Sequence, residues 1–359
     1  MVKKMTKAYI LAFQRATNYG AVLQIFAFKK ILERLGLTVE VIDYVPDWMP
    51  ARIKSQPSIG SFVKRKMLAF TFRKFLKELN LTKAKFFDSI SLKANLPEAD
   101  FYFVGSDQVW NENLIRKDAT YFLDFVPDAS HKIGYAVSMG NNHLSDDFRK
   151  EVTPLIRRFH KLSVRETFVA NFLKESLHVD SFVVLDPTLL LQERDYDEIR
   201  DEKKWNTEFI AVYSAMHDSG IYELSKYLRA KTNLPIVNLG YHFNGADKQE
   251  YIFGPGHWLS RIKESSYFIT NSFHGSAFAI LYKKKFFSVP TQNPSHQGLN
   301  ARFVELLKSL DLTSRLVNSE SDISNLLGEP IDYKRTYYLL DKRRNQSMRF
   351  LAEAIGEVK

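Results

Sequence analysis

The chain has 359 residues, a length that predicts about two domains. Its composition, 45% hydrophobic and 26% charged, is typical of a globular protein and argues against disorder. It contains no cysteine, which excludes disulfides, zinc–thiolate sites and a cysteine nucleophile. Lys and Arg number 51 against 41 Asp and Glu, and the net charge of +10 favours an anionic partner: a phosphorylated small molecule, a nucleic acid or an anionic membrane surface.

Sequence patterns narrow the partner and the location. The chain has no RNA-recognition signature, no paired Cys/His metal spacing and no long Lys/Arg tract, so we do not expect it to bind nucleic acid. The apolar run at residues 8–13 is too short for the hydrophobic region of a signal peptide. No window approaches the ~18 apolar residues that a membrane span needs. We therefore expect a cytoplasmic protein.

The N-terminal residues predict a βαβ unit. A buried strand is expected at residues 9–13, a helix at 21–35 that ends before Gly36, and a strand at 39–44. Such a unit is expected to cross over in the right-handed sense. Residues 50–95 then break the alternation, and we expect them to form a helical insertion.

The basic and aromatic part of this insertion, residues 61–87, has two interpretations. One is an amphipathic helical pair that covers the first sheet. The other is a surface that meets an anionic membrane, and with it a lipid-linked acceptor, from the cytoplasmic side.

Alternation of strands and helices resumes after the insertion and continues almost to the end of the chain. In the first half the expected strands are 101–104, 132–137, 161–165 and 182–185, and the expected helices are 147–160 and 167–177. Residues 186–206 are polar and are expected to form a linker. In the second half the expected strands are 209–213, 235–239, 267–270 and 286–289, and the expected helices are 222–230, 257–263 and 272–283. A long basic helix is expected at 333–358.

This order predicts an α/β fold made of two Rossmann-like halves with mostly parallel strands. The expected domains are residues 1–195, with the insertion at about 50–95, and residues 196–330. Residues 331–359 are expected to form a helix that packs back on the first domain.

Polar corners follow several predicted strands, at the edge where open α/β sheets bind ligands. The first corner, residues 14–20, is rich in polar donors but lacks the glycine fingerprint of a dinucleotide site, so an ordinary turn is the alternative. The second corner, residues 105–111, reads GSDQVWN. Its Gly-Ser-Asp could simply cap a helix, whereas its tryptophan and two amides would suit a sugar.

The third corner, residues 163–166, ends in Arg165. A buried arginine is costly without a partner, so Arg165 could form a structural ion pair with Glu166 or Asp186. Alternatively it could bind an anion through both arms of its guanidinium group. The residues alone leave these two interpretations open.

The fourth corner, residues 266–276, carries His274 where a predicted strand meets the start of a predicted helix. Backbone N–H groups and the helix dipole favour anions there, so a histidine at this point is a candidate acid or base. The alternative is a histidine with a purely structural hydrogen bond. The chain has neither the G-x-S-x-G elbow of serine hydrolases nor a D-x-D pair after a strand in its second half, so neither a hydrolase nor a metal-dependent sugar transferase is favoured, and we expect no metal.

Five segments, taken in order, resemble the polysaccharide pyruvyl transferase family. They are NYGAVLQ at 18–24, VGSDQVWN at 104–111, SVRE at 163–166, LDPT at 185–188 and TNSFHGSAF at 270–278. The resemblance spans roughly residues 8–290. Each segment is a weak signal by itself, whereas the ordered set is fairly specific.

The resemblance implies an enzyme that transfers the enolpyruvyl group of phosphoenolpyruvate, as a co-substrate and without a cofactor, to two hydroxyls of one sugar to form a cyclic ketal. It implies a role in bacterial capsular polysaccharide, exopolysaccharide or cell-wall glycan synthesis, with a sugar or lipid-linked oligosaccharide as acceptor. It also implies a fold like that of type B glycosyltransferases (GT-B), with two Rossmann-like domains facing a cleft.

Residue roles follow from the same resemblance. His274 matches the family's acid/base histidine and Arg165 an arginine near the donor. Some members carry an arginine where this chain has Ser272, and we expect Arg302 to supply the missing cation. The residues that we expect to bind the donor are Asn271, Ser272, Gly275, Ser276 and Arg302, of which Arg302 is our own assignment and not part of the resemblance. The residues of the first two corners that we expect to bind the acceptor are Asn18, Tyr19, Gly20, Ser106, Asp107, Gln108, Trp110 and Asn111.

Two other functions are compatible with the sequence. One is a nucleotide-sugar-dependent glycosyltransferase of the same fold, although the second half has no clear base-binding or ribose-binding signature. The other is a non-catalytic glycan-binding relative, which the presence of His274 and Arg165 argues against.

Overall fold

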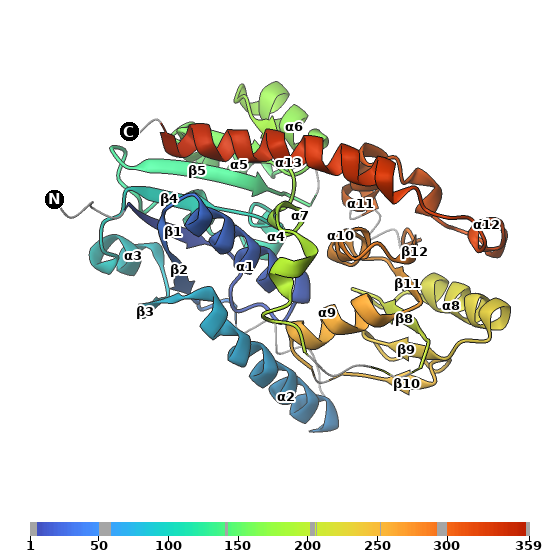
Figure 1. Ribbon diagram of the computed structural model, residues 1–359. Coiled ribbons are helices and arrows are strands. Elements are labelled where there is room, and N and C mark those ends of the chain that lie inside the picture. Colours follow the sequence, from blue (N-terminus) through green and yellow to red (C-terminus); the bar gives the residue numbers. More distant parts are fainter. Residues whose placement is uncertain are drawn as a thin grey trace. The chain divides into compact units, whose positions relative to one another are not determined.

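A computed structural model of the chain describes residues 6–49, 59–140, 143–201, 205, 207–251, 253–292 and 300–356, and for residues 59–65 it describes the backbone only. The chain divides into two compact units (Figure 1). Unit 1 comprises Met1–Arg65, Arg73–Leu191 and Arg343–Lys359, and unit 2 comprises Lys66–Phe72 and Gln192–Lys342.

Unit 1 is built on a seven-stranded parallel sheet with the strand order β3-β2-β1-β4-β5-β6-β7. The strands are β1 (Lys7–Leu11), β2 (Thr38–Tyr44), β3 (Leu81–Phe86), β4 (Phe101–Val104), β5 (His131–Val137), β6 (Lys161–Val164) and β7 (Phe182–Val183). The helices are α1 (Tyr19–Arg34), α2 (Ile59–Phe75, shared with unit 2), α3 (Ser89–Asn95), α4 (Glu112–Ile115), α5 (Asp146–Ile156), α6 (Thr167–Leu177) and α7 (Pro187–Leu190). This order is that of a Rossmann-like sheet.

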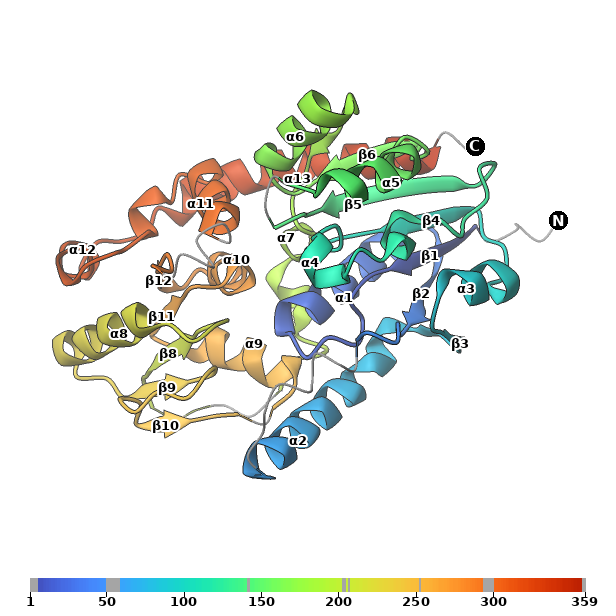
Figure 2. The same cartoon turned by 180° about the vertical axis from the view of Figure 1, so that it is seen from behind.

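Helices cover both faces of the unit 1 sheet because successive strand side chains point to opposite faces. On one face, Phe28 of α1 packs against Phe103 and Tyr135 of β4 and β5, with ring centroids 5.4 and 4.8 Å apart. On the other face, apolar side chains of α5 and α6 pack against Tyr102 and Val104 of β4. Figure 2 shows the molecule from behind, with α5 and α6 in front of this sheet.

Unit 2 repeats the design with a five-stranded parallel sheet in the order β10-β9-β8-β11-β12. The strands are β8 (Ile210–Tyr213), β9 (Ile236–Asn238), β10 (Lys248–Gln249), β11 (Tyr267–Thr270) and β12 (Lys285–Ser288). The helices are α8 (Ser219–Thr232), α9 (Pro255–Glu264), α10 (Phe273–Leu281), α11 (Asn300–Ser309) and α12 (Glu320–Leu326). One face of this sheet packs on α8, and on the other Trp258 of α9 meets Phe278 of α10 edge to face.

The last helix, α13 (Tyr333–Gly356), contributes residues to both units. In unit 2, Tyr337 donates from its hydroxyl to the carbonyl of Leu281 over 2.7 Å, at the end of α10. In unit 1, Arg344 donates to the carbonyl of Leu191 over 3.0 Å, and the Ser347 hydroxyl accepts from the Leu185 N–H over 2.9 Å.

Most expected elements are confirmed within two or three residues at each end, and two expectations are wrong. The segment 50–95 is not wholly helical, because β3 pairs in parallel with β2 and extends the sheet. The expected helical pair at 61–87 is accordingly one helix, α2, followed by a short 3-10 turn and this strand. The expected linker also begins too early, because α7 lies within it and Leu189 is fully buried in unit 1.

The membrane interpretation of residues 61–87 stays a prediction. Within this stretch Met67, Phe70 and Phe87 are exposed, at 49%, 55% and 51% respectively. The side chains of 61–65 lie outside the described residues. In the part of the chain that the structure describes, no helix combines the length and the apolar character that crossing a bilayer requires.

Candidate functional site

The corner that carries His274 lies beside the topological switch point of unit 2. The chain runs from β8 to β9 and β10 on one side, and the next strands, β11 and β12, lie on the other, so the strand order reverses between β8 and β11. Open α/β sheets bind ligands at the carboxyl ends of the two strands that flank such a point. The loops at 214–218 and 271–272, which follow β8 and β11, occupy this position.

Asn271 ties these two loops together. Its side-chain amide donates from Nδ2 to the Ser214 hydroxyl over 2.8 Å, and its Oδ1 accepts the Ala215 N–H over 2.8 Å. The side chain is therefore committed to the protein at both ends. Asn271 therefore has a structural role: it connects the loop that follows β11 to the loop that follows β8.

Ser272 begins α10 and is its N-cap. The Ser272 hydroxyl accepts the Gly275 N–H over 3.3 Å, which is the usual role of a serine at this position. Ser276, one turn later, donates to the Ser272 carbonyl over 3.1 Å and is hydrogen-bonded to the Ser288 hydroxyl over 2.8 Å. These serines therefore fix the helix start to the neighbouring strand β12.

Gly275 is required by close packing. A Cβ atom placed on this residue would lie 2.5 Å from Oγ1 of Thr270, closer than real Cβ contacts come. The Thr270 hydroxyl itself donates to the Tyr213 carbonyl over 2.7 Å and accepts the Ser272 N–H over 3.1 Å. Gly275 thus allows α10 to begin tightly against the end of β11.

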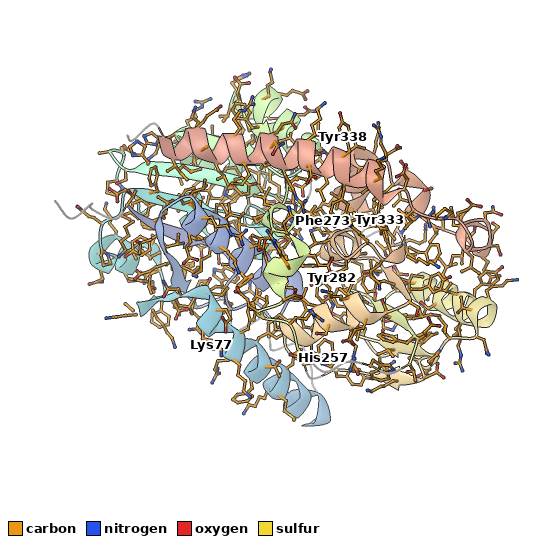
Figure 3. The ribbon with its side chains drawn as sticks, viewed as in Figure 1. Lys77, His257, Phe273, Tyr282, Tyr333 and Tyr338 are labelled. Carbon is orange, nitrogen blue, oxygen red and sulfur yellow. The ribbon has the colours of Figure 1, made fainter. Side chains whose placement is uncertain are left out.

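His274 is the second residue of α10, as the sequence predicted from the strand-to-helix transition. It is 6% exposed, and its ring meets that of Phe273 edge to face at 5.1 Å (Phe273 is labelled in Figure 3). The first N–H groups of a helix and its dipole favour a negative charge at this end. The nearly buried imidazole of His274 therefore lies at a helix start that favours an anion.

Arg302, expected to replace a missing cation, lies on α11, which packs beside α10. The helix begins at Asn300, whose side chain exchanges hydrogen bonds with the backbone of Thr291 over 3.0 Å in both directions. Thr291 follows β12. Arg302 is half-buried, and its donor-binding role stays a prediction.

In unit 1, Arg165 forms buried ion pairs. Its Nε donates to Glu166 over 2.8 Å and its Nη1 to Asp186 over 2.9 Å, while Asp107 lies 3.9 Å from Nη2. Burial disfavours the charged guanidinium, but the carboxylates of Glu166, Asp186 and Asp107 outweigh it and raise the pKa of Arg165 above its usual value. Of the two interpretations that the sequence left open, the structure shows the ion pair with both Glu166 and Asp186.

Ser106 belongs to the same network. Its hydroxyl is within hydrogen-bond distance of the Ala136 carbonyl and of Asp186 Oδ2, 3.1 Å in each case, and its N–H donates to Gln24 Oε1 over 3.1 Å. Because Ser106 is fully buried, the expectation that it binds an acceptor sugar directly is wrong. It joins the segments that carry Gln24, Arg165 and Asp186 into one polar cluster at the carboxyl edge of the sheet.

Trp110 also corrects an expectation. It is 1% exposed, its ring stacks on Phe122 at 4.9 Å and its Nε1 donates to the Tyr121 carbonyl over 2.9 Å. The flat surface that we expected it to offer a sugar is therefore covered by the core of unit 1.

The remaining residues of this corner keep partial exposure. Asp107 and Gln108 are half-buried, and Asp107 has a positive φ of 68°. Asn111 caps α4 and donates from Nδ2 to Gln108 Oε1 over 2.9 Å. Gly140 lies against this pair, since a Cβ there would be 2.0 Å from Gln108 Oε1. These three side chains can still reach a ligand, and their acceptor-binding role stays a prediction.

The first corner is partly closed. Asn18 is exposed, and its Oδ1 caps α1 by accepting the Ala21 N–H over 3.1 Å. Tyr19 is 7% exposed and Gly20 is buried, so of these three predicted acceptor residues only Asn18 presents its side chain widely to solvent.

Two polar residues of the unit 1 network were not predicted as functional. Gln24 is fully buried in α1, and Ser138 donates its hydroxyl to Glu166 Oε1 over 2.9 Å. Gln24 could have been recognised from the sequence, because it is a polar residue among the apolar residues that α1 buries. Ser138 follows β5 with no local pattern that distinguishes it.

Comparison with known proteins agrees with this architecture. MnaA from S. aureus, in a co-structure with UDP, superposes with a TM-score of 0.50 at 14% identity, covering 94% of this chain and 90% of that one. UDP-GlcNAc 2-epimerase from Neisseria meningitidis bound to UDP-GlcNAc gives a TM-score of 0.48 at 10% identity, covering 98% and 100%. The first of these likenesses shows the fold alone, a two-domain Rossmann-like fold of the GT-B type. No curated protein sequence matches the chain significantly.

The sequence model of one family covers most of the chain. The model of polysaccharide pyruvyl transferases matches residues 18–293, a span that includes all five of the segments that resemble the family and both the Arg165 cluster and the His274 corner. A transferase that modifies polysaccharides is therefore supported. The chain belongs to the polysaccharide pyruvyl transferase family.

Proposed function

We propose that the protein transfers the enolpyruvyl group of phosphoenolpyruvate to two hydroxyls of one sugar, forming a cyclic pyruvate ketal in bacterial capsular, exopolysaccharide or cell-wall glycan synthesis. The observation that carries the proposal is the position of His274, at the start of α10 and beside the switch point of unit 2, in a member of this family.

The donor's charges suit this corner. Phosphoenolpyruvate carries a phosphate and a carboxylate, and both are favoured near the N–H groups at a helix start. The hydrogen bonds of Asn271, Ser272 and Ser276 hold α10 in place without using ionised groups. The positive end of this helix is thus fixed before the donor binds, and an anion there needs little rearrangement of the protein.

The reaction requires two proton transfers that an imidazole can serve. The first sugar hydroxyl attacks C2 of the donor and loses its proton, while C3 gains a proton and becomes a methyl group. The second hydroxyl then attacks C2, the C2–O bond to phosphate breaks, and its proton leaves with the phosphate. A histidine that donates and accepts these protons contributes typically ~10²–10⁴-fold. We assign this role to His274.

The cationic groups have different parts in this scheme. The ion pairs of Arg165 favour a positioning role in which its guanidinium orients Asp107, the half-buried carboxylate of the cluster. Arg302 on α11 is the cation that we assign to the departing phosphate. Asn18, Asp107, Gln108 and Asn111 are the side chains that we assign to the acceptor.

The experiment is phosphate release from phosphoenolpyruvate with a panel of oligosaccharide and lipid-linked acceptors. His274→Ala should lower turnover by ~10²-fold or more while leaving the melting temperature and phosphoenolpyruvate binding nearly unchanged. His242→Ala is the matched control, because His242 is an exposed histidine of the same unit. Full activity of the His274 variant would refute the assigned role.

The donor itself is tested by binding. Thermal-shift measurements should show stabilisation by phosphoenolpyruvate and not by nucleotide sugars. Stabilisation by a UDP-sugar together with glycosyl transfer would establish the glycosyltransferase alternative. Glycan binding with no turnover, and with no phosphoenolpyruvate binding, would establish the non-catalytic alternative.

A further inference from the structure

A basic pocket of about 610 Å³ lies at the amino edge of the unit 2 sheet, the edge opposite the one that carries His274. Tyr267 and Lys285, the first residues of β11 and β12, line it. Lys231, near the end of α8, and Lys283 and Lys284, just after α10, complete its cationic lining. None of these residues belongs to the proposed donor or acceptor site.

None of the four lysines of this pocket forms an ion pair with a described carboxylate, although the charges of Glu193 and Glu264 act on Lys284 from a greater distance. Among the described residues, no carboxylate lies within 4.0 Å of their ammonium groups, and Glu208 is the one acidic residue of the lining. Elsewhere in unit 2 lysines are paired: Lys226 with Glu223 over 2.9 Å, and Lys248 with Glu250 over 2.9 Å. The lining of the pocket therefore carries three more positive than negative side chains.

The contacts that these lysines do make leave their charges in place. The Nζ atoms of Lys283 and Lys285 lie 4.6 and 5.5 Å from the ring centroids of Tyr337 and Tyr267. Lys284 donates to the Lys263 carbonyl over 2.8 Å. Aromatic rings and a carbonyl attract an ammonium group, but they do not neutralise it.

Helix dipoles account for part of this charge. The helices α8, α9 and α10 all end at this edge, and each C-terminus is equivalent to roughly half a negative charge. Lysines next to helix ends are favourable for this reason alone. The three helix ends together offset roughly one and a half of the three excess positive charges. A net excess of roughly one and a half positive charges therefore remains. A phosphate monoester carries about −1.5 to −2 charges at neutral pH, which matches that excess.

Lys284 adds a further indication. It is half-buried, and burial lowers the pKa of its ammonium group from the ordinary lysine value, a shift that the charges of Glu193 and Glu264 oppose but do not cancel. A phosphate in the pocket would compensate this cost by pairing with the ammonium. The hydroxyl-bearing residues Thr232 and Ser266 also line the pocket and are groups of the kind that bind phosphate oxygens.

We propose that this pocket binds a phosphate group, separately from the catalytic corner. The group could come from a soluble phosphorylated compound or from the head group of a lipid, and both share the chemistry that the lysines recognise. The inference does not depend on the proposed function, because it rests on the charge balance of the opposite sheet edge.

The test uses inorganic phosphate and pyrophosphate as probes, with the full chain and calorimetric titration at low ionic strength. Wild type should bind with a saturable isotherm, and the double variant Lys231→Ala/Lys285→Ala should bind at least tenfold more weakly. The matched control is Lys226→Ala/Lys308→Ala, which removes the same charge from exposed positions of the same unit outside the pocket and should bind as wild type does. Equal weakening in both double variants, or no saturable binding by wild type, would overturn the proposal.

Two further arms locate the site and its source. Arg302→Ala, which removes the cation that we assign to the donor's phosphate, should bind inorganic phosphate as wild type does, and loss of binding there instead of in the lysine variant would place the ion at the catalytic corner and overturn the inference. Flotation with phosphatidylcholine vesicles containing phosphatidic acid should recover wild type but not the lysine variant if the phosphate belongs to a lipid. Saturable binding of free phosphate without flotation would instead identify a soluble ligand of the same pocket.

Discussion

Arg165 donates from Nη1 to Oδ2 of Asp186 over 2.9 Å, and the same carboxylate oxygen lies 3.1 Å from the hydroxyl of Ser106. These three residues come from three of the segments that resemble the family. In unit 1 the matched segments therefore form a buried polar cluster. This cluster connects the loops at the carboxyl edge of the sheet.

The first prediction concerns this cluster. Arg165→Ala should lower the free energy of unfolding by about 3–5 kcal/mol, because it leaves the buried carboxylates of Glu166 and Asp186 uncompensated. Urea denaturation measures the change. Arg158→Ala, which breaks a pair with the exposed Asp128, is the control and should cost much less stability than Arg165→Ala. If both variants lost equally little free energy of unfolding, the cluster would not stabilise the fold.

The second prediction concerns Gly275. Gly275→Ala should cost about 1–3 kcal/mol, because its Cβ would lie 2.5 Å from Thr270 Oγ1. In a Thr270→Ala background the same change should cost less, since the clashing atom is gone. A double-mutant cycle from denaturant unfolding measures this coupling. Gly328→Ala, where a Cβ would meet nothing within 4 Å, should be close to neutral. Additive effects of the two changes at the corner would contradict the close packing.

The third prediction separates packing from sugar recognition at Trp110. Trp110→Phe should destabilise the protein by about 1–3 kcal/mol, because the Tyr121 carbonyl loses its buried donor. Below the melting temperature of the variant, its KM for the acceptor should equal that of wild type. An increase in KM without destabilisation would instead support direct contact between Trp110 and the sugar.

The fourth prediction concerns Asp124, whose carboxyl pKa is raised chiefly by burial. A raised folded-state pKa means that folding favours the protonated acid, so wild type loses stability as pH rises from about 4 through that pKa. Asp124→Asn removes the cost of the buried charge. The variant should melt higher than wild type at pH 7, and the difference should shrink towards pH 4. A difference that does not vary with pH would contradict this assignment.

The periodicity of apolar residues was sufficient to predict the α/β order. Strand β11 and helix α6 were predicted with their observed bounds, because each is a short apolar run next to a polar corner. Strand β3 was missed, since LTKAKF alternates lysines with few apolar residues and lies at a sheet edge. Its pairing with β2 is a long-range contact that local patterns do not contain.

The position of the candidate site could be predicted from the sequence, whereas the roles of its residues could be predicted only in part. The strand-to-helix corner located His274 correctly, because residue types at a helix start follow local rules. Whether Arg165 points to a ligand or to carboxylates depends on Asp186, a residue 21 positions away in the chain. Whether Trp110 offers its ring to a sugar or belongs to the core depends on its contacts with Phe122 and Tyr121, which local sequence patterns do not contain.

The sequence by itself determined the family, the alternation of strands and helices, and the corner where an imidazole meets a helix start, because these depend on order along the chain. Only the tertiary structure decided which polar side chains are used internally, because burial and hydrogen-bond partners arise when distant segments meet. It also brought four lysines together at one sheet edge: Lys231 lies more than fifty positions before Lys283, Lys284 and Lys285, and parallel strands joined by helices bring their ends to the same place.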